Sequence, residues 1–355
     1  MRYLKIGNKK ISLKDPTYFI ADIGANHDGS ILRAKKLIRL AKLAGADAAK
    51  FQHFAAKTIV SDKGFRKIKS ETSHQKKWKK SVFEVYKLAS LNTNWTKKLK
   101  IYCDQLGIEF MTSPYSLKIL NEINPYVKAI KIGSGDITWI DIIKEIAKKK
   151  KVGLLATGAS TLFEVDKAVK EYLKFNKSLV LMQCNTNYTG DKKNINFVNL
   201  NVLKQFKRKY PHLILGLSDH TFGHASVIGA VTLGARVVEK HFTDDNKRIG
   251  PDHFFAMNPD SWKEMIKATR EVEAALGDGY KKVEKNELAT IVVQRRSIRV
   301  NKNIKKGTII KANMLTYLRP CPKNALEPSK KTLILNKKLK KNLSTEDIIE
   351  LRDVK

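Results

Sequence analysis

Two histidines that end apolar runs are the first candidates for chemistry in this sequence. His220 follows HLILGLSD and His241 follows ARVVEK. If the two runs are neighbouring parallel strands, their ends lie only about 4.8 Å apart, and both imidazoles can hold one divalent metal ion. The alternative is that each histidine only hydrogen bonds to its own loop. The residues that end the other runs have to decide between these interpretations.

Polar side chains end the other apolar runs as well. The lysines and hydroxyl groups among them suit a multiply charged anion, because both donate hydrogen bonds to phosphate oxygens. A phosphorylated substrate is the natural inference, although each lysine alone is also compatible with a solvated or internally paired side chain. The run ends carry Asp22, Asn26, His27, Lys50, Gln52, Thr112, Ser113, Tyr115, Lys131, Ser134, Asp136, Thr157, Asn185, Asn187, Tyr188, Ser218, Asp219, Glu239 and Lys240.

Eight apolar runs alternate with amphipathic helical stretches, and this count favours an α/β (β/α)8 TIM barrel, whose usual length is about 250 residues. A doubly wound open sheet rarely has eight consecutive parallel units, and its first turn is normally GxGxxG, whereas the first turn here is GANHDGS. Active sites of barrel enzymes lie at the C-terminal strand ends, so the polar residues form one expected site. The predicted strands are 17–23, 47–52, 108–113, 129–134, 152–157, 179–184, 213–219 and 236–241, and the predicted helices are 30–43, 94–106, 117–123, 139–147, 162–175, 200–208, 222–233 and 260–276.

The chain is expected to hold one large and one small domain. We predict a barrel domain over residues 1–276, a linker over 277–296 and a small β-rich domain over 297–355, where short strand-like runs are broken by turns such as KKG. The long connection 53–93 is either a lid over the barrel mouth or a plain insertion.

Composition limits the classes of protein. The 355 residues include 69 Lys+Arg against 34 Asp+Glu, a net charge of +35, which attracts polyanions and anionic metabolites. The densest basic groups fall at predicted helix ends and turns, so no specific nucleic-acid role is expected. The three cysteines predict neither a disulfide framework nor a CxxC metal site. No leader and no membrane-spanning run is evident, and we expect a cytoplasmic protein.

Several motifs in order resemble the sialic acid synthase family: FIADIGANHDGS, GADAAKFQ, IKIGSGDI, GLSDHT and EKHFTDDNKRIGPDHFFAM. The resemblance covers nearly the whole chain, and the C-terminal segment resembles that family's antifreeze-like (SAF, β-clip) domain. It implies a transferase that condenses phosphoenolpyruvate with N-acetylmannosamine or a related acylamino sugar. In this reaction water adds and phosphate leaves by C–O cleavage. The product is a nonulosonic, sialic-type acid.

The resemblance also implies roles for individual residues. His220 and His241 would be ligands of a divalent metal ion, with Mn²⁺ as the first choice and Mg²⁺ and Co²⁺ as alternatives. The family further implies a homodimer in which Arg319 of the C-terminal domain reaches the sugar bound by the other subunit. The phosphoenolpyruvate-binding positions are Lys50, Ser113, Lys131, Ser134 and Ser218, the sugar-binding positions are Gln52, Tyr188, Asp252 and Arg319, and the catalytic candidates are Asp22, Asp136 and Asp252.

This sequence departs from the family pattern at three places. Asp22 and Asp136 stand where the family commonly has glutamate, which shortens each side chain by one methylene. The family's CTxxYP is CNTNYTG here, so the sequence does not say which of Asn185, Thr186 and Asn187 contacts a ligand. N-acetylneuraminic, legionaminic and pseudaminic acid all remain candidate products.

Two rival interpretations come from other mechanisms. A barrel aldolase could form a Schiff base through Lys131 or Lys240. A non-catalytic polyanion-binding barrel would explain the charge of +35 without any reaction.

Overall fold

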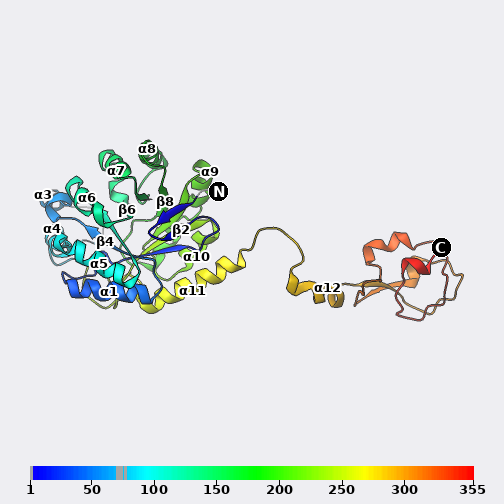
Figure 1. Cartoon of the computed structure of the whole chain (residues 1–355). Helices are drawn as coiled ribbons and strands as arrows, with labels where there is room; N and C mark the ends of the chain where they lie inside the picture. Colours follow the sequence, from blue (N-terminus) through cyan, green and yellow to red (C-terminus); the bar gives the residue numbers. More distant parts are fainter. Residues whose placement is uncertain (1–2, 69–74, 76–77) are drawn as a thin grey trace. The chain divides into compact units, whose positions relative to one another are not determined.

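The protein contains a closed barrel of eight parallel strands, which confirms the predicted (β/α)8 fold (Figure 1). The structure is a computed structural model that describes residues 3–68, 75 and 78–355. Around the barrel the strands follow the order β10-β3-β4-β5-β6-β7-β8-β9, so the first and last barrel strands close the sheet. The barrel strands are β3 (Tyr18–Asp22), β4 (Ala48–His53), β5 (Glu109–Pro114), β6 (Ala129–Ile132), β7 (Val152–Ala156), β8 (Leu179–Cys184), β9 (Ile214–Asp219) and β10 (Ala235–His241).

Side chains alternate between the two faces of each barrel strand, as the pleat requires. In β3, Tyr18 and Ile20 belong to a cluster inside the barrel, whereas Phe19 and Ala21 belong to the larger core between strands and helices. The same alternation directs one set of polar side chains inward at the C-terminal ends. That set comprises Asp22, Lys50, Gln52, Ser113, Lys131, Ser218, Glu239 and His241.

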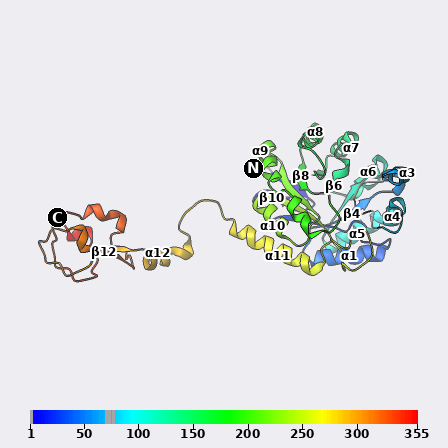
Figure 2. The ribbon, with the colours of Figure 1, turned by 180° about the vertical axis from the view of Figure 1, so that it is seen from behind.

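Helices cover the outside of the barrel; α10 lies beside β10, and α11 lies beside α10 (Figure 2). Several helices begin at the capping residues that such sequences favour: Ser30 accepts a hydrogen bond from the Arg33 amide, and Thr161 and Glu164 form a capping box. The outer helices are α1 (Ile31–Leu43), α5 (Thr96–Leu106), α6 (Leu117–Ile123), α7 (Ile140–Lys148), α8 (Leu162–Leu173), α9 (Val202–Lys209), α10 (Ala225–Thr232) and α11 (Pro259–Ala275). Within the described residues, no helix is long and apolar enough to cross a bilayer.

An N-terminal hairpin that the sequence analysis did not anticipate packs against the floor of the barrel. It consists of β1 (Leu4–Ile6) and β2 (Lys9–Ile11), which pair in antiparallel fashion. Leu4, Ile6 and Ile11 are buried in the same cluster as the lower inward-facing side chains of the barrel strands. The hairpin therefore closes the end of the barrel opposite the polar residues.

The long connection 53–93 contributes to the barrel mouth. It contains α2 (Ala56–Ile59), α3 (Asp62–Lys67) and α4 (Val82–Ala89), while 69–74 and 76–77 lie outside the described residues. Phe54 packs against Tyr86 of α4 and against Tyr115 after β5, with ring centroids 5.3 and 6.0 Å apart. This part of the chain thus forms an aromatic wall beside the strand ends.

The chain divides into two compact units, residues 1–277 and 278–355. The second unit contains α12 (Leu288–Gln294), β11 (Ser297–Val300) and β12 (Leu315–Leu318), and the two strands are antiparallel. Four isolated bridges, including those joining Arg299 to Ile348 and Ile304 to Leu343, extend the β-structure. Buried aliphatic side chains such as Ile298, Val300 and Ile349 give this small β-rich unit its own core. The finer division with a linker over 277–296 stays a prediction, and α12 falls within that range.

Candidate active site

A buried layer of paired charges lies inside the C-terminal half of the barrel. Lys50 Nζ lies 2.7 Å from Asp22 Oδ2, and Lys131 Nζ lies 2.6 Å from Glu239 Oε1. A distance of 4.0 Å between Lys50 Nζ and Glu239 Oε1 joins the two pairs. Ser218 Oγ lies 3.3 Å from Lys131 Nζ and donates to Glu239 Oε1 at 3.2 Å. The charges of two lysines and two carboxylates therefore neutralise each other in the buried interior of the barrel.

Strand register explains why these side chains meet. Asp22 is the register partner of Lys50 on β4 and of His241 on β10, and Glu239 is the register partner of Ser218 on β9. Ser113 is level with Gln52 on the neighbouring strand and is buried. Lys50, Ser113, Lys131 and Ser218 are each at most 4% exposed, so they lie at the bottom of the site.

The two acids of this layer are held in the ionised form. Burial alone would raise the pKa of Asp22, but Lys50 and His241 lower it to about 2. Gln52 Nε2 and the Gly24 amide also donate to this carboxylate at 3.0 Å. For Glu239, too, the effect of burial on its pKa is outweighed by Lys131 and Lys50, which lower it. Both carboxylates stay anionic at neutral pH.

His220 and His241 lie side by side at the mouth, with ring centroids 5.5 Å apart. His220 Nδ1 lies 2.9 Å from the Asn185 carbonyl, which can only accept, so Nδ1 carries the proton and Nε2 keeps its lone pair. A hydrogen bond from one ring nitrogen to a carbonyl typically orients a metal-binding histidine. Burial lowers the pKa of His220, but Cys184 near Nδ1 outweighs burial and raises it.

His241 stands between two carboxylates. Its Nε2 lies 3.6 Å from Asp22 Oδ2 and its Nδ1 lies 3.7 Å from Asp252 Oδ2. Burial lowers the pKa of His241, which favours the neutral imidazole that a metal requires. Gly24, with a φ of +50°, allows this approach, because a Cβ there would lie 2.8 Å from Asp252 Oδ2 and 3.3 Å from the His241 ring.

The residues present fit a divalent metal completed by water or substrate. Among the residues that the structure describes, His241 Nδ1 is buried and has no hydrogen-bond partner, and a buried polar atom of this kind calls for a ligand. Within residues 3–68, 75 and 78–355, no group of three or more His, Cys, Asp or Glu is arranged to hold a metal ion by itself. Two imidazoles alone would leave coordination positions of a bound ion open, as a catalytic rather than a structural site requires.

A cavity of about 430 Å³ opens above this layer. It joins the strand ends to the aromatic wall formed by Phe54 and Tyr86. Asp136 is half-buried at its edge, and burial raises the pKa of this carboxyl group to about 6. Such a group can exchange a proton near neutral pH. The cavity is lined by Ala25, Gln52, Phe54, Ile59, Gln75, Trp78, Val85, Tyr86, Ala89, Tyr115, Gly133, Ser134, Gly135, Asp136, Thr186, Tyr188, His241, Pro251 and Asp252.

In the loop after β8, some polar side chains hydrogen bond within the protein and one lines the cavity. Thr186 lines the cavity. Asn187 Oδ1 instead accepts from the amide and hydroxyl of Thr189, at 2.9 and 2.7 Å. Asn185 donates its side-chain amide to the Phe197 carbonyl. Ser134, from the neighbouring loop, accepts from the Gly158 amide at 2.9 Å. Among the three candidates of this loop, Thr186 therefore faces the place where a ligand would lie.

One further observation decides the family. The model of the NeuB family matches residues 37–281 of this chain. The chain belongs to the NeuB family. An N,N'-diacetyllegionaminic acid synthase of Campylobacter jejuni is 35% identical over 342 residues, which cover 94% of this chain and 98% of that protein. A pseudaminic acid synthase of the same species is 33% identical, with 99% of both chains covered.

A solved structure agrees with this membership in the NeuB family. The crystal structure of an N-acetylneuraminic acid synthetase from Leptospira borgpetersenii, in complex with citrate, has a TM-score of 0.72 and 26% identity. It covers 82% of this chain and 95% of that chain. The resemblance expected from the motifs is thereby confirmed at the level of family and fold.

The structure brings nearly all predicted site residues of this NeuB-family chain to one barrel end. Arg319 belongs to the second unit, where it is exposed and precedes Pro320 in a cis peptide bond. Its contribution to the site stays a prediction. Lys240, the rival Schiff-base lysine, faces outward: it is ion-paired to Asp219, donates to the Thr221 carbonyl at 2.7 Å and is buried. Lys240 is not among the residues that line the cavity, which disfavours an aldolase mechanism through this lysine.

Sequence reasoning gave no role to two residues that complete the site of this NeuB-family chain. Glu239 ends a predicted strand, but the sequence did not show that it pairs with Lys131. Phe255 packs against His241 and His220, with ring centroids 5.1 and 6.2 Å apart, and Tyr188 packs against both His220 and Phe255, with ring centroids 4.4 and 5.7 Å apart. Strand alternation could have identified Glu239 as a site residue, because a residue two positions before His241 lies on the same, inner face of the strand.

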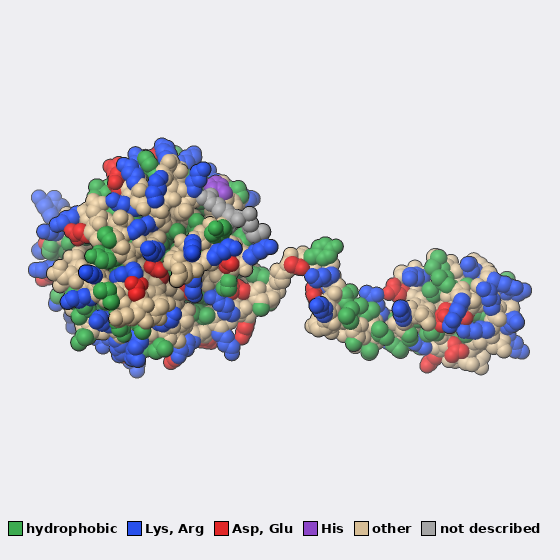
Figure 3. Space-filling view, viewed as in Figure 1, with side chains coloured by type: hydrophobic (Ala, Val, Ile, Leu, Met, Phe, Trp, Pro, Cys, Tyr) green, Lys and Arg blue, Asp and Glu red, His purple; other side chains and the backbone are tan. Residues whose placement is uncertain are grey.

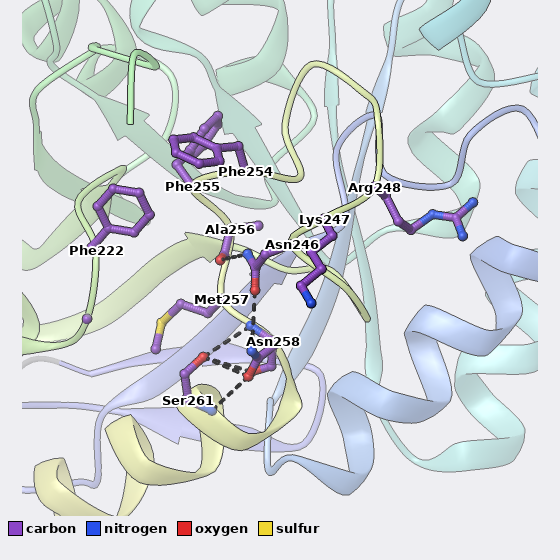
Figure 4. A pocket seen from close by; sticks show the side chains of 11 residues that line it. Phe222, Asn246, Lys247, Arg248, Phe254, Phe255, Ala256, Met257, Asn258 and Ser261 are labelled. Atoms are coloured by element: carbon purple, nitrogen blue, oxygen red, sulfur yellow. Dashed lines mark hydrogen bonds between the residues drawn. The ribbon is translucent and has the colours of Figure 1, made fainter. Parts of the chain in front are cut away.

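A second cavity of about 770 Å³ is lined in part by Phe255, the residue that packs against both histidines (Figure 4). Phe222 and Phe254 approach each other edge to face across it, with ring centroids 5.7 Å apart. Asn246 donates to the carbonyls of His253 and Ala256, at 2.9 and 2.6 Å, and so holds the loop between β10 and α11 in a closed turn. This loop carries Asp252 and Phe255 to the site.

Proposed function

We propose that this protein is a synthase that condenses phosphoenolpyruvate with an acylamino sugar and releases phosphate. One observation carries the proposal: two buried, ion-paired lysines lie beneath a cavity lined by His241, Asp136 and Asp252, and His220 is adjacent to His241. The lower layer suits an anion, and the upper layer suits a polarised sugar aldehyde. The synthases among the relatives, from the same family, support this assignment.

The lower layer would bind phosphoenolpyruvate. Lys50 and Lys131 are matched by Asp22 and Glu239, so an incoming phosphate or carboxylate can replace an acid as the partner of each ammonium group. Ser113, Ser134 and Ser218 would supply hydroxyl donors to the same anion. Gln52, Tyr188 and Asp252, which line the cavity, would contact the sugar.

His220 and His241 would hold the divalent metal, with Mn²⁺ as our first choice and Mg²⁺ or Co²⁺ as alternatives. When bound, such an ion supplies Lewis acidity toward the sugar aldehyde oxygen. The enol carbon of phosphoenolpyruvate then attacks the aldehyde carbon, and positive charge develops at the enol ether carbon. Asp22, which is anionic because its pKa is about 2, is suited to stabilise that charge.

Asp136 is the candidate for activating the water that adds to this carbon. Its pKa of about 6 leaves the carboxylate ionised at neutral pH but able to accept a proton. Asp252 lies beside His241 and would orient the sugar or the water. The shortening of Asp22 and Asp136 relative to glutamate is therefore compatible with both roles, because both carboxylates already reach the site.

The remaining family expectations belong to the same proposal. The second unit would act as an antifreeze-like domain, with Arg319 contacting the sugar of the other subunit in a domain-swapped homodimer. We also propose that the protein works in the cytoplasm. The product stays among N-acetylneuraminic, legionaminic and pseudaminic acids, and the relatives at 35% and 33% identity include synthases of the latter two.

The polyanion-binding alternative has less support. Lys and Arg side chains are spread over the visible faces of both units and are interrupted by acidic and apolar groups (Figure 3). Binding to a polyanion would also not require the buried charges of the lower layer.

Phosphate release tests the proposal. The full-length protein, phosphoenolpyruvate and Mn²⁺ are incubated with N-acetylmannosamine and with diacetamido-trideoxyhexoses, and the products are identified by mass spectrometry. Sugar-dependent phosphate release with a nonulosonic acid product supports the synthase. Release with none of the sugars, for protein that binds Mn²⁺, would contradict it. His241→Ala should lose Mn²⁺ binding in a titration that needs no turnover.

A further inference from the structure

Two loops meet beside the histidines and are tied together by charged side chains. The first loop, 23–30, follows β3, and the second, 242–258, follows β10. Asn26 Nδ2 donates to the Phe242 carbonyl at 2.9 Å, and Arg33 at the start of α1 pairs with Asp244. These contacts fix the beginning of the second loop. Its middle, which carries Asp252, is held by a different residue.

Asp28 is the centre of this second set of contacts. Its Oδ2 accepts from Arg248 Nε and Nη2 at 3.0 and 2.9 Å and lies 2.9 Å from Arg33 Nε. Its Oδ1 lies 2.9 Å from His253 Nε2. One carboxylate thus binds the second loop on both sides of Asp252, four residues before it and one residue after it. Figure 4 shows Arg248 directed away from the phenylalanines.

The far side of His253 is fixed as well. His253 is fully buried, and its Nδ1 lies 2.7 Å from Thr243 Oγ1. The Asp252 carboxylate between these anchors accepts from the Ala25 amide at 3.1 Å. A carboxylate held in this way has little freedom to change its distance from His241. Asp28 itself does not line the cavity.

We propose that Asp28 is a positioning residue, which latches the loop 242–258 and so sets the place of Asp252 at the sugar side of the site. This inference rests on the proposed function for its kinetic consequence. The phosphoenolpyruvate side is built on Lys50 and Lys131, which come from strands and do not depend on the latch. Loss of Asp28 should therefore raise the KM for the sugar and leave the KM for phosphoenolpyruvate nearly unchanged.

Kinetics of two Asp28 variants give the first test. Asp28 has a φ of +49°, a left-handed conformation that asparagine also tolerates, so Asp28→Asn keeps the turn and removes only the charge. We expect the KM for the sugar to rise about threefold in Asp28→Asn and at least tenfold in Asp28→Ala, with the KM for phosphoenolpyruvate within twofold of wild type. A purely structural role would lower kcat through loss of folded protein and leave both KM values unchanged.

Asp166→Ala is the matched control. Asp166 also has three partners, Lys170, Lys209 and Tyr210, and its side chain is 20% exposed against 24% for Asp28, but it lies on α8. It should leave the sugar KM unchanged. Equal sugar KM values in Asp28→Ala and wild type would overturn the proposal.

Hydrogen exchange gives a readout that needs no activity. The amides of Thr243 and Met257 donate to the carbonyls of Met257 and His241 and close the loop. Peptides from 243–257 should exchange at least tenfold faster in Asp28→Ala than in wild type or Asp166→Ala. Unchanged exchange would overturn the latch. If the wild type releases no phosphate, the proposed function fails, while the exchange result still decides whether Asp28 holds the loop.

Discussion

Replacing Glu239 with glutamine removes one charge from the buried layer of the site and keeps its shape. Lys131 Nζ lies 2.6 Å from Glu239 Oε1, and both side chains are at most 6% exposed. Removing one partner of a buried pair typically costs about 3–5 kcal/mol, because the other charge is left without compensation. For a unit of this size, that corresponds to a fall in Tm of roughly 10 °C.

The same substitution should strengthen the binding of phosphoenolpyruvate. In the wild type, Lys50 and Lys131 are balanced by Asp22 and Glu239, whereas the variant carries one excess positive charge. One unit charge about 5 Å from an anion is worth roughly 3 kcal/mol at an effective dielectric constant of about 20. If about half of this remains after the lysines reorient, binding tightens by roughly tenfold.

Calorimetry measures both effects on one preparation. Unfolding scans give the loss of stability, and titration with phosphoenolpyruvate, without sugar, gives the affinity. Glu145→Gln is the control, because Glu145 Oε1 also lies 2.6 Å from a lysine, Lys148, but with side chains 38% and 50% exposed. Exposed pairs of this kind add little to stability, because water and salt screen them. Unchanged stability of Glu239→Gln, or weaker binding of phosphoenolpyruvate, would refute the charge-balance reasoning.

Three further predictions follow from the site. Because Asp136 has a raised pKa of about 6, it gains a proton as the pH falls through that value, so kcat should fall below about pH 6; Asp136→Asn should be slow at all pH values and lack this limb of the pH–rate profile. Arg319→Ala should raise the sugar KM, and mixed dimers of Arg319→Ala with His241→Ala subunits should regain partial activity; no regain would argue against domain swapping. Lys240→Met should unfold at a lower temperature than the wild type, because buried Asp219 loses its ion pair. Borohydride with a ketoacid should trap no adduct in the wild type. A trapped adduct would support Lys131 as a Schiff-base lysine.

The barrel and its strand ends were predictable because periodicity and position determine them. Alternation in β10 puts Glu239 and His241 on one face and Lys240 on the other, and this pattern alone would have excluded Lys240 from the mouth. Predicted helix ends differ from the observed ones by a few residues, as at 222–233 against Ala225–Thr232. Helix ends depend on caps and local packing, which periodicity does not report.

Contacts between distant loops were not predictable in the same way. Nothing in the spacing of Asp28, Arg248 and His253 indicates that they meet, because the two loops approach only when the last strand pairs with the first. The hairpin of residues 4–11 was also missed, since each strand has three residues and carries charged side chains. Three residues are too few for the alternation of apolar and polar side chains to identify a strand.

The hairpin beneath the barrel has a kinetic consequence. With the floor closed by Leu4, Ile6 and Ile11, both substrates must enter through the mouth. The lysine layer lies deeper than Gln52, Tyr188 and Asp252, so a sugar resting on the upper residues would block the way to the lower ones. If the proposed binding residues are right, phosphoenolpyruvate would load first and the sugar second, and the enzyme should follow an ordered rather than a random sequence of binding.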